Sequence, residues 1–268
     1  MIKLKISLVG CGVIGTEIVK ATSSVKEVEL VAVVDLDRNK AEKVVKLSKD
    51  SPKITDIDEA VRMADMVVEC ASTAVVLELA KKTLNQGKDI MIMSTGGLVD
   101  HLDLLDLARE KDVCIYLPSG AVCGLDGLKS ATAGKVRSVT LTTSKPPNAL
   151  QGAPYLIENN IDLSKIKEKK VIFEGNAREA IRGFPANINV AVSLSLAGIG
   201  WEQTKVRIIA DPSLKVNVHE VEVVGDFGRI ITRTENVQSP MNPKTSYLAA
   251  LSAVATFKRI IDPIKIGT

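Results

Sequence analysis

The residues whose types and spacing most directly indicate chemistry lie near the amino terminus, in the hexapeptide GCGVIG at positions 10–15. Such a GxGxxG motif binds dinucleotides when it follows a strand, opens a helix and precedes an acidic residue by about 20 positions. LKISLVG predicts the strand, TEIVKATSS predicts the helix, and Asp35 ends the next apolar run. The context therefore predicts a dinucleotide site, and the alternative is a glycine-rich turn in an unrelated α/β protein.

The residues of this motif have separate physical parts to play. Gly10 permits the tight turn, Gly12 lets the backbone approach a pyrophosphate, and Gly15 lets the helix pack closely on the strand. Val13 and Ile14 open the helix, whose free N–H groups and partial positive charge attract phosphates. We expect all five residues to bind the cofactor.

The choice of cofactor depends on Asp35 and Arg38. An aspartate at this position hydrogen-bonds the adenosine ribose and repels a 2′-phosphate, which favours NAD over NADP. Arg38, three residues later, could pair with that phosphate, so NADP stays possible as well.

Proton transfer near neutral pH points to histidine, and the chain has two, His101 and His219. His101 lies in LVDHLDLLDLA, where we expect a surface position in an early helical turn. His219 lies in VNVHEVEVV, and strand alternation places it on one face with Asn217, Val221 and Val223. It is a candidate acid or base; the alternative is a hydrogen-bonded core histidine.

Two lysines and one cysteine are further candidates. Lys145 and Lys244 follow predicted strands and could anchor carboxylates, although solvent-exposed loop lysines are expected at such positions. Cys123 in SGAVCGLDG could act as a thiolate nucleophile. Nothing nearby in the sequence activates it, so we expect a small buried cysteine.

The elements that must position these residues form two groups. Up to residue 120, short β-branched apolar runs alternate with helical segments, which predicts an α/β fold: a Rossmann, doubly wound parallel sheet. Later runs predict an α+β domain with a mainly antiparallel open sheet, one hairpin at GDFG and one helix at 187–196. The predicted domains are residues 1–120, joined by a C-terminal helix at 245–268, and residues 121–244.

Composition limits the partners. The chain has 268 residues, 46% of them hydrophobic and 3% aromatic, and a net charge of +3 from 35 basic and 32 acidic residues. This near balance predicts neither a nucleic-acid nor a membrane partner. Four cysteines without a CxxC pair predict no metal site and no disulfide framework, and they suit the reducing cytoplasm.

Several stretches together resemble the L-aspartate dehydrogenase family. Besides GCGVIG they are STGGL (94–98), PSGAVCGLDGL (118–128), GNAREAIRGFPANINVAVSLSLAG (175–198) and NPKTSYLAALSAVA (242–255). The resemblance implies a Rossmann domain joined to a domain that carries catalysis and the homodimer contact. It also implies NAD(P)-dependent oxidative deamination of L-aspartate to iminoaspartate, which hydrolyses to oxaloacetate and ammonia. The reverse reaction is reductive amination, and iminoaspartate feeds NAD biosynthesis.

The resemblance extends to single residues. His219 matches the family's active-site histidine, which makes it the expected general acid or base. Ala121 and Asn189 match the NAD contacts on the nicotinamide side, and Asn187 is a near alternative to Asn189.

The two carboxylates of aspartate need cations or hydrogen-bond donors. The candidates are Thr143, Ser144, Lys145 and Lys244. Two rival functions remain: an oxidoreductase like homoserine dehydrogenase, which uses lysine and aspartate, and a non-catalytic protein that senses NAD(H).

Overall fold

Short apolar runs in the first 120 residues form strands whose side chains are buried on both sides, as expected for a parallel sheet between two helical layers. The computed structural model describes residues 3–185, 189–239 and 242–267. The chain divides into a first unit, Met1–Gly120 with Ala249–Lys265, and a second unit, Ala121–Leu248 with Ile266–Thr268. In the described ranges, no helix has both the length and the apolar character needed to cross a membrane.

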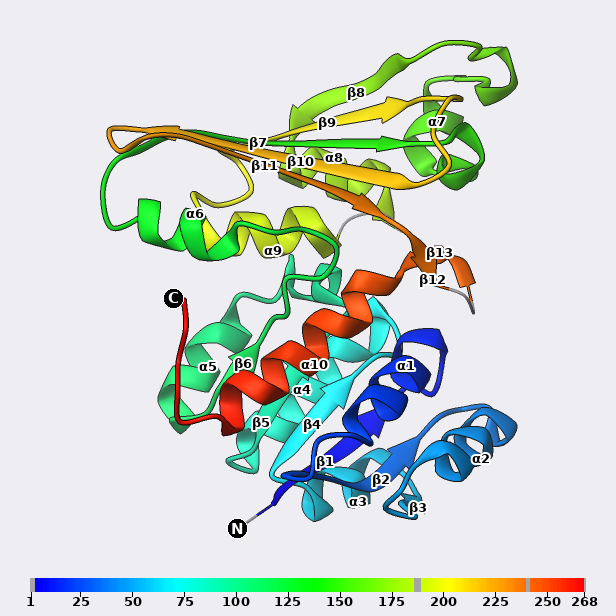
Figure 1. Ribbon diagram of the computed structural model, residues 1–268, viewed down its shortest axis with the longest axis vertical. Helices are drawn as coiled ribbons and strands as arrows, with labels where there is room; N and C mark the ends of the chain where they lie inside the picture. Colours follow the sequence, from blue (N-terminus) through cyan, green and yellow to red (C-terminus); the bar gives the residue numbers. More distant parts are fainter. Residues whose placement is uncertain (1–2, 186–188, 240–241, 268) are drawn as a thin grey trace. The chain divides into compact units, whose positions relative to one another are not determined.

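The first unit has a parallel sheet with strand order β3-β2-β1-β4-β5-β6 (Figure 1). This order confirms the predicted Rossmann fold, and it places the topological switch point between β1 and β4. The strands are β1 (Leu4–Val9), β2 (Val28–Val34), β3 (Lys53–Ile54), β4 (Met66–Glu69), β5 (Asp89–Ile92) and β6 (Ile115–Tyr116).

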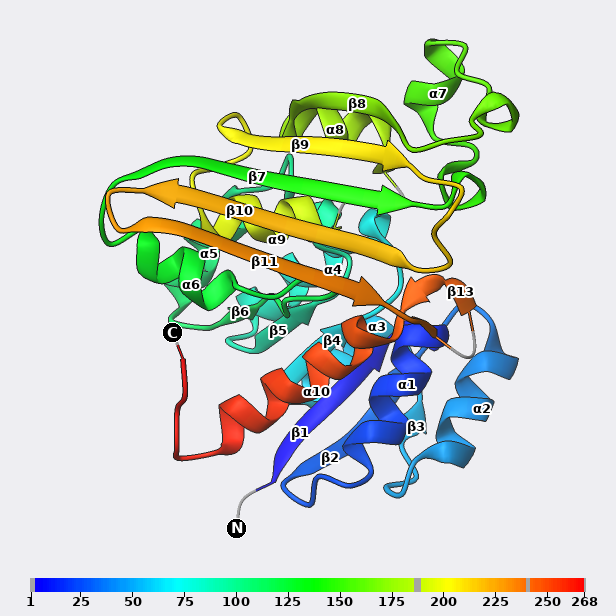
Figure 2. The same cartoon turned by 45° about the horizontal axis from the view of Figure 1, so that its top comes forward.

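Helices cover both faces of this sheet (Figures 1 and 2). They are α1 (Val13–Thr22), α2 (Arg38–Leu47), α3 (Ile57–Met63), α4 (Thr73–Asn85), α5 (Asp103–Lys111) and α10 (Tyr247–Ile261), with a 3₁₀ turn η1 (Thr95–Leu98). Ile6 of β1, Ile18 of α1 and Phe257 of α10 belong to one buried cluster. The last helix of the chain therefore completes the core that the first strand begins.

The carboxyl-terminal helix is shorter than predicted. A helix was expected over 245–268, but α10 ends at Ile261, and Pro263 follows. Proline disfavours helical backbone in the residue before it, which accounts for the end of α10. On the amino-terminal side, β13 (Asn242–Ser246) pairs with β12 (Gln238–Ser239).

The second unit has a sheet with strand order β11-β10-β7-β9-β8. β7 and β9 run parallel, and the other neighbouring pairs are antiparallel, which confirms the predicted mainly antiparallel sheet. Gly225 pairs with Gly228 at the end of the predicted hairpin. The strands are β7 (Val136–Lys145), β8 (Lys170–Asn176), β9 (Thr204–Ala210), β10 (Asn217–Gly225) and β11 (Gly228–Asn236).

One face of this second sheet is covered by helices α6, α8 and α9, and we call it the inner face (Figures 1 and 2). The helices are α6 (Leu125–Ala131), α8 (Ala177–Gly183) and α9 (Asn189–Ala197); the loop after β7 adds η2 (Pro147–Leu150), α7 (Pro154–Glu158) and η3 (Leu163–Lys165). Within the described residues, α9 confirms the helix predicted at 187–196, but the expectation that it is the single helix against this sheet was wrong. With 7 residues each, α6 and α8 are too short for helical periodicity to stand out.

Candidate active site

The glycine loop after β1 has the geometry that a dinucleotide needs. Gly10 has φ +100°, and a side chain there would come within 2.5 Å of the Cys70 backbone. A side chain at Gly15 would meet the Gly10 carbonyl oxygen at 2.2 Å, so α1 packs closely on the strand. At Gly12 an added Cβ would meet nothing within 4 Å, which leaves open space beside the start of α1.

Helix α1 begins at Val13, followed by Ile14, and Gly12 is its N-cap. Among the residues described, no side chain caps this helix. The first-turn N–H groups therefore remain available to an anion, as in other dinucleotide sites. The close approach of α1 and the open space at Gly12 fit a bound pyrophosphate.

Asp35 lies directly after β2 and beside the glycine loop. Its Oδ2 accepts the Cys11 backbone N–H at 2.7 Å, and its Oδ1 accepts the Asp37 N–H at 2.8 Å. Arg38, the first residue of α2, pairs with Glu42 at 3.1 Å, and its side chain is 81% exposed. The negative charge of Asp35 stands where a ribose is expected, while Arg38 is engaged on its own helix.

Glu69, at the end of β4, is a residue that the sequence analysis missed. Its side chain is fully buried and accepts hydrogen bonds from the Ala71 N–H (2.7 Å), the Ser94 N–H (2.9 Å) and the Ser94 hydroxyl (3.0 Å). Burial raises the pKa of this carboxyl, against the effect of those hydrogen bonds. Glu69 thereby joins the loops after β4 and β5, at the carboxyl edge where ligands of this fold bind. The sequence signal that could have identified Glu69 is an acidic residue at the end of the apolar run MVVE.

His219 in the second unit lies on β10, directly opposite Thr143 of β7. Its Nδ1 is 3.0 Å from the Thr143 hydroxyl, and the residue is 5% exposed. Burial, assisted by the nearby charge of Lys145, lowers the pKa of His219 to about 3. The imidazole is therefore neutral at neutral pH.

Lys145 is the last residue of β7 and shares the inner face with Thr143, two positions earlier. It is 7% exposed, and burial lowers its pKa to about 8. The expectation of a solvent-exposed loop lysine was wrong, because β7 continues to Lys145 before Pro146 follows. A small cavity borders Thr143 and is otherwise lined by apolar side chains such as Phe184 and Ile208, which explains the weak solvation of this region.

The other carboxylate candidates do not gather in the same way. Ser144 alternates with Thr143 and Lys145 along β7, so its side chain faces the opposite side of the sheet. The backbone of Lys244 lies in β13. The structure therefore brings Thr143 and Lys145 to His219 and turns Ser144 away.

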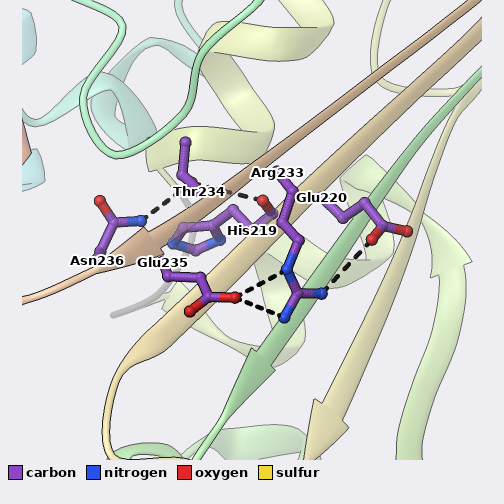
Figure 3. Close-up of polar contacts among 6 residues, drawn as sticks. All are labelled: His219, Glu220, Arg233, Thr234, Glu235 and Asn236. Carbon is purple, nitrogen blue, oxygen red and sulfur yellow. Dashed lines mark hydrogen bonds and ion pairs between the residues drawn. The ribbon is translucent and has the colours of Figure 1, made fainter.

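Ala121 is linked by hydrogen bonds to β11, the strand that pairs with β10 and His219. Thr234, which pairs with His219, donates its hydroxyl to the Ala121 carbonyl at 2.9 Å. The Asn236 amide donates to the same carbonyl at 3.0 Å. It also donates to the Thr234 hydroxyl at 3.1 Å (Figure 3). Of the remaining nicotinamide-side candidates, Asn189 is the first residue of α9, and Asn187 lies outside the described residues.

The charged residues that flank His219 and its cross-strand partner Thr234 face the other side of the sheet. Glu220 and Glu235 both pair with Arg233, at 3.7 and 2.9 Å, on the uncovered side of the sheet (Figure 3). Exposed pairs of this kind contribute little to stability. On the inner face, the charged side chain near His219 is Lys145.

Two smaller expectations were also tested. Cys123 is exposed, contrary to expectation, because Ala121 and Val122 occupy the buried positions of its loop. His101 is half-buried in the turn before α5 and is not a fully exposed surface residue.

Both units of the chain match known protein families. Residues 126–260 match the family model described as aspartate dehydrogenase, C-terminal, and residues 10–118 match the homoserine dehydrogenase NAD binding domain. The L-aspartate dehydrogenase of Methanococcoides burtonii is 52% identical over 99% of this chain and 100% of its own length. That of Bradyrhizobium diazoefficiens is 40% identical over 99% of this chain and 95% of its own length.

The fold of this chain is also similar to that of solved structures. Aspartate dehydrogenase from Thermotoga maritima has a TM-score of 0.78 at 29% identity, covering 98% of this chain and 99% of that chain. Myo-inositol dehydrogenase from Lactobacillus casei, 16% identical with a TM-score of 0.57 over 100% of this chain and 89% of its own, shares the fold alone. The first unit is thus an NAD(P)-binding Rossmann domain. Because relatives at 40% to 52% identity match both units from end to end, this chain belongs to the L-aspartate dehydrogenase family.

Proposed function

We propose that this protein is an NAD(P)-dependent L-aspartate dehydrogenase, which oxidises L-aspartate to iminoaspartate and, after hydrolysis, yields oxaloacetate and ammonia. The observation that carries the proposal is the buried row of Lys145, Thr143 and His219 on one sheet face. In this row, Lys145 can bind a carboxylate, and the neutral His219 beside it can accept a proton. The half-identical relatives named L-aspartate dehydrogenase support the choice of substrate.

The bound dinucleotide supplies the acceptor for the hydride that leaves the substrate Cα. The glycine loop, the start of α1 and Asp35 would hold its phosphates and adenosine ribose. The proposed contacts are Gly10, Gly12, Val13, Ile14, Gly15, Asp35, Ala121 and Asn189, with Asn187 as an alternative to Asn189 and Arg38 as a contact for NADP.

His219 is proposed as the general base and acid. With the proton on Nδ1, it donates to the Thr143 hydroxyl, and its Nε2 lone pair is then free to take a proton. It accepts one as water adds to the imine carbon and returns it to the departing nitrogen. Positioned proton transfer of this kind contributes about a hundredfold or more in rate.

Lys145 is proposed to bind a substrate carboxylate. Burial disfavours its charged form, and an arriving carboxylate restores that form through a charge-assisted hydrogen bond. Thr143 and Lys244 are the further candidates for carboxylate binding. Ser144 is not proposed, since its side chain faces away from His219.

The proposal is tested by following NADH and NADPH formation with L-aspartate, L-glutamate, L-homoserine and L-alanine. Turnover confined to L-aspartate is the expected result. Turnover of L-homoserine would instead support the homoserine dehydrogenase alternative. NADH binding without turnover of any amino acid would support the sensing alternative.

We further propose that the protein is a cytoplasmic homodimer whose iminoaspartate supplies NAD biosynthesis. The uncovered face of the second sheet carries exposed Ile231, and Phe227 in the turn between β10 and β11 is exposed as well, which suits a protein contact. The four cysteines are free thiols, which suits a reducing compartment. Light scattering of the purified protein tests the dimer, and a twofold monomer mass is expected.

A further inference from the structure

The inner face holds a buried polar atom that no hydrogen bond of the described residues satisfies. Asn217 is 5% exposed, and its side-chain oxygen Oδ1 has no hydrogen-bond partner within the described part of the chain. Its neighbour on β11, Asn236, shows the contrast: its amide donates to Ala121 and Thr234, and its oxygen accepts the Ser246 hydroxyl at 2.9 Å.

The position of Asn217 relates it directly to the group around His219. The two residues are separated by one position on β10, so their side chains share the inner face. Val218 pairs with Ser144 across the antiparallel β7–β10 ladder. Continuing that register by one residue brings Asn217 to the level of Lys145.

A buried carbonyl oxygen without a hydrogen-bond donor destabilises the folded protein, and native proteins rarely retain one without a reason. A ligand that brings an N–H group to this face would remove the cost. In a dicarboxylic amino acid the two carboxylates only accept hydrogen bonds, and the amino group is the one that donates.

We propose that the Asn217 side-chain oxygen accepts a hydrogen bond from the amino group of the substrate and from the N–H of the imine. This inference rests on the proposed aspartate dehydrogenase function and names the residue that recognises the reacting nitrogen. Asn217 is thereby a specificity residue for the amine and the imine.

The same oxygen discriminates against the ketone. In reductive amination, hydride from NAD(P)H adds to the imine carbon, and a proton adds to nitrogen. If oxaloacetate is reduced directly, the hydride adds to the ketone carbon, a proton adds to oxygen, and a 2-hydroxy diacid forms. A ketone oxygen facing the Asn217 oxygen places two acceptors together, which disfavours that reaction.

The test uses the full-length protein with three substitutions of Asn217. Asn217→Leu keeps the size and removes the acceptor, Asn217→Ala removes it with less bulk, and Asn217→Asp keeps an acceptor. Ser195→Ala is the matched control, because Ser195 Oγ is the other buried side-chain oxygen without a partner in the described chain and has no assigned part in the reaction.

Two quantities are measured: kcat/KM for L-aspartate, and the ratio of amino acid to hydroxy acid formed from oxaloacetate, ammonium and NADH. We expect Asn217→Leu and Asn217→Ala to lower kcat/KM about tenfold or more and to raise the hydroxy-acid share, with NADH binding unchanged. Asn217→Asp keeps the amino acid as the main product, and Ser195→Ala leaves both quantities unchanged.

The inference is overturned if a folded Leu or Ala variant that still binds NADH retains the wild-type kcat/KM and product ratio. Should the Leu variant not fold, the Ala variant decides by the same criteria. A wild-type protein that does not oxidise L-aspartate overturns the proposed function instead. The two failures are therefore distinguished by the wild-type assay alone.

Discussion

The Nδ1 atom of His219 lies 3.0 Å from the hydroxyl of Thr143, across a strand pair that joins residues 76 positions apart. This contact orients the imidazole through Nδ1 and leaves Nε2 to take part in proton transfer.

Replacing His219 tests the proton transfer. His219→Asn keeps an amide near the Nδ1 position, which can still contact Thr143, and removes Nε2. We expect kcat for L-aspartate to fall about a hundredfold or more, while the Kd for NADH stays within about twofold. Steady-state kinetics and a fluorescence titration measure these quantities. A large loss of NADH binding with little change in kcat would contradict the assignment.

Replacing Thr143 tests the orientation of the imidazole. Thr143→Val conserves shape and removes the hydroxyl, so His219 loses the partner of Nδ1. A fall in kcat of about tenfold is expected, smaller than that of His219→Asn. Thr142→Val is the control, because Thr142 alternates with Thr143 and faces the other side of β7. Equal effects of the two threonine variants on kcat would contradict the role of Thr143 in orienting the imidazole.

Replacing Lys145 tests the carboxylate contact. Lys145→Met keeps the buried stem and removes the charge, and we expect KM for L-aspartate to rise about tenfold or more. In the wild-type protein the pKa of Lys145 is about 8, so KM should rise as pH increases through that value. The variant should lose this dependence. Lys205→Met, at an exposed lysine of β9, is the control, and an unchanged KM in Lys145→Met would refute the role.

The stability of the protein should report the buried imidazole as well. The pKa of His219 is about 3 in the folded protein and about 6.5 when unfolded, so between these values only the unfolded chain binds the proton. The free energy of unfolding therefore falls as pH drops through this window, by about 1.4 kcal/mol per pH unit from this residue. Urea unfolding of wild type and His219→Asn at pH 7 and pH 5 measures the difference. Identical pH dependence in the two proteins would show that His219 binds its proton equally in the folded and unfolded states, which contradicts the lowered pKa.

Replacing Asp35 tests the cofactor preference. Asp35→Asn keeps oxygen and nitrogen atoms near the Cys11 N–H but removes the charge that repels a 2′-phosphate. We expect the ratio of kcat/KM for NADP to that for NAD to rise about tenfold. Arg38→Ala in the Asp35→Asn background should then lower it again, if Arg38 leaves Glu42 to bind the phosphate. A ratio that is the same in all three proteins would rule out both roles.

The amino-acid sequence by itself determined the features that depend on local periodicity. GCGVIG between a strand and a helix, followed by Asp35, predicted the Rossmann unit because each requirement is met within a short stretch of chain. Alternation along VNVHEVEVV correctly placed Asn217 and His219 on one buried face, since neighbouring side chains of a strand point to opposite sides.

Only the tertiary structure decided which distant residues meet and how much water reaches them. Lys145 resembles a loop lysine in the sequence, but the pairing of β7 with β9 makes it the end of a strand, and the covered inner face buries it. The pairing of β7 with β10 sets Thr143 against His219 and turns Ser144 away. Ala121 is held by Thr234 and Asn236, more than 100 positions later. Strand register and burial are non-local properties, so the lowered pKa values of His219 and Lys145 and the unpartnered oxygen of Asn217 follow from packing that no short stretch of sequence contains.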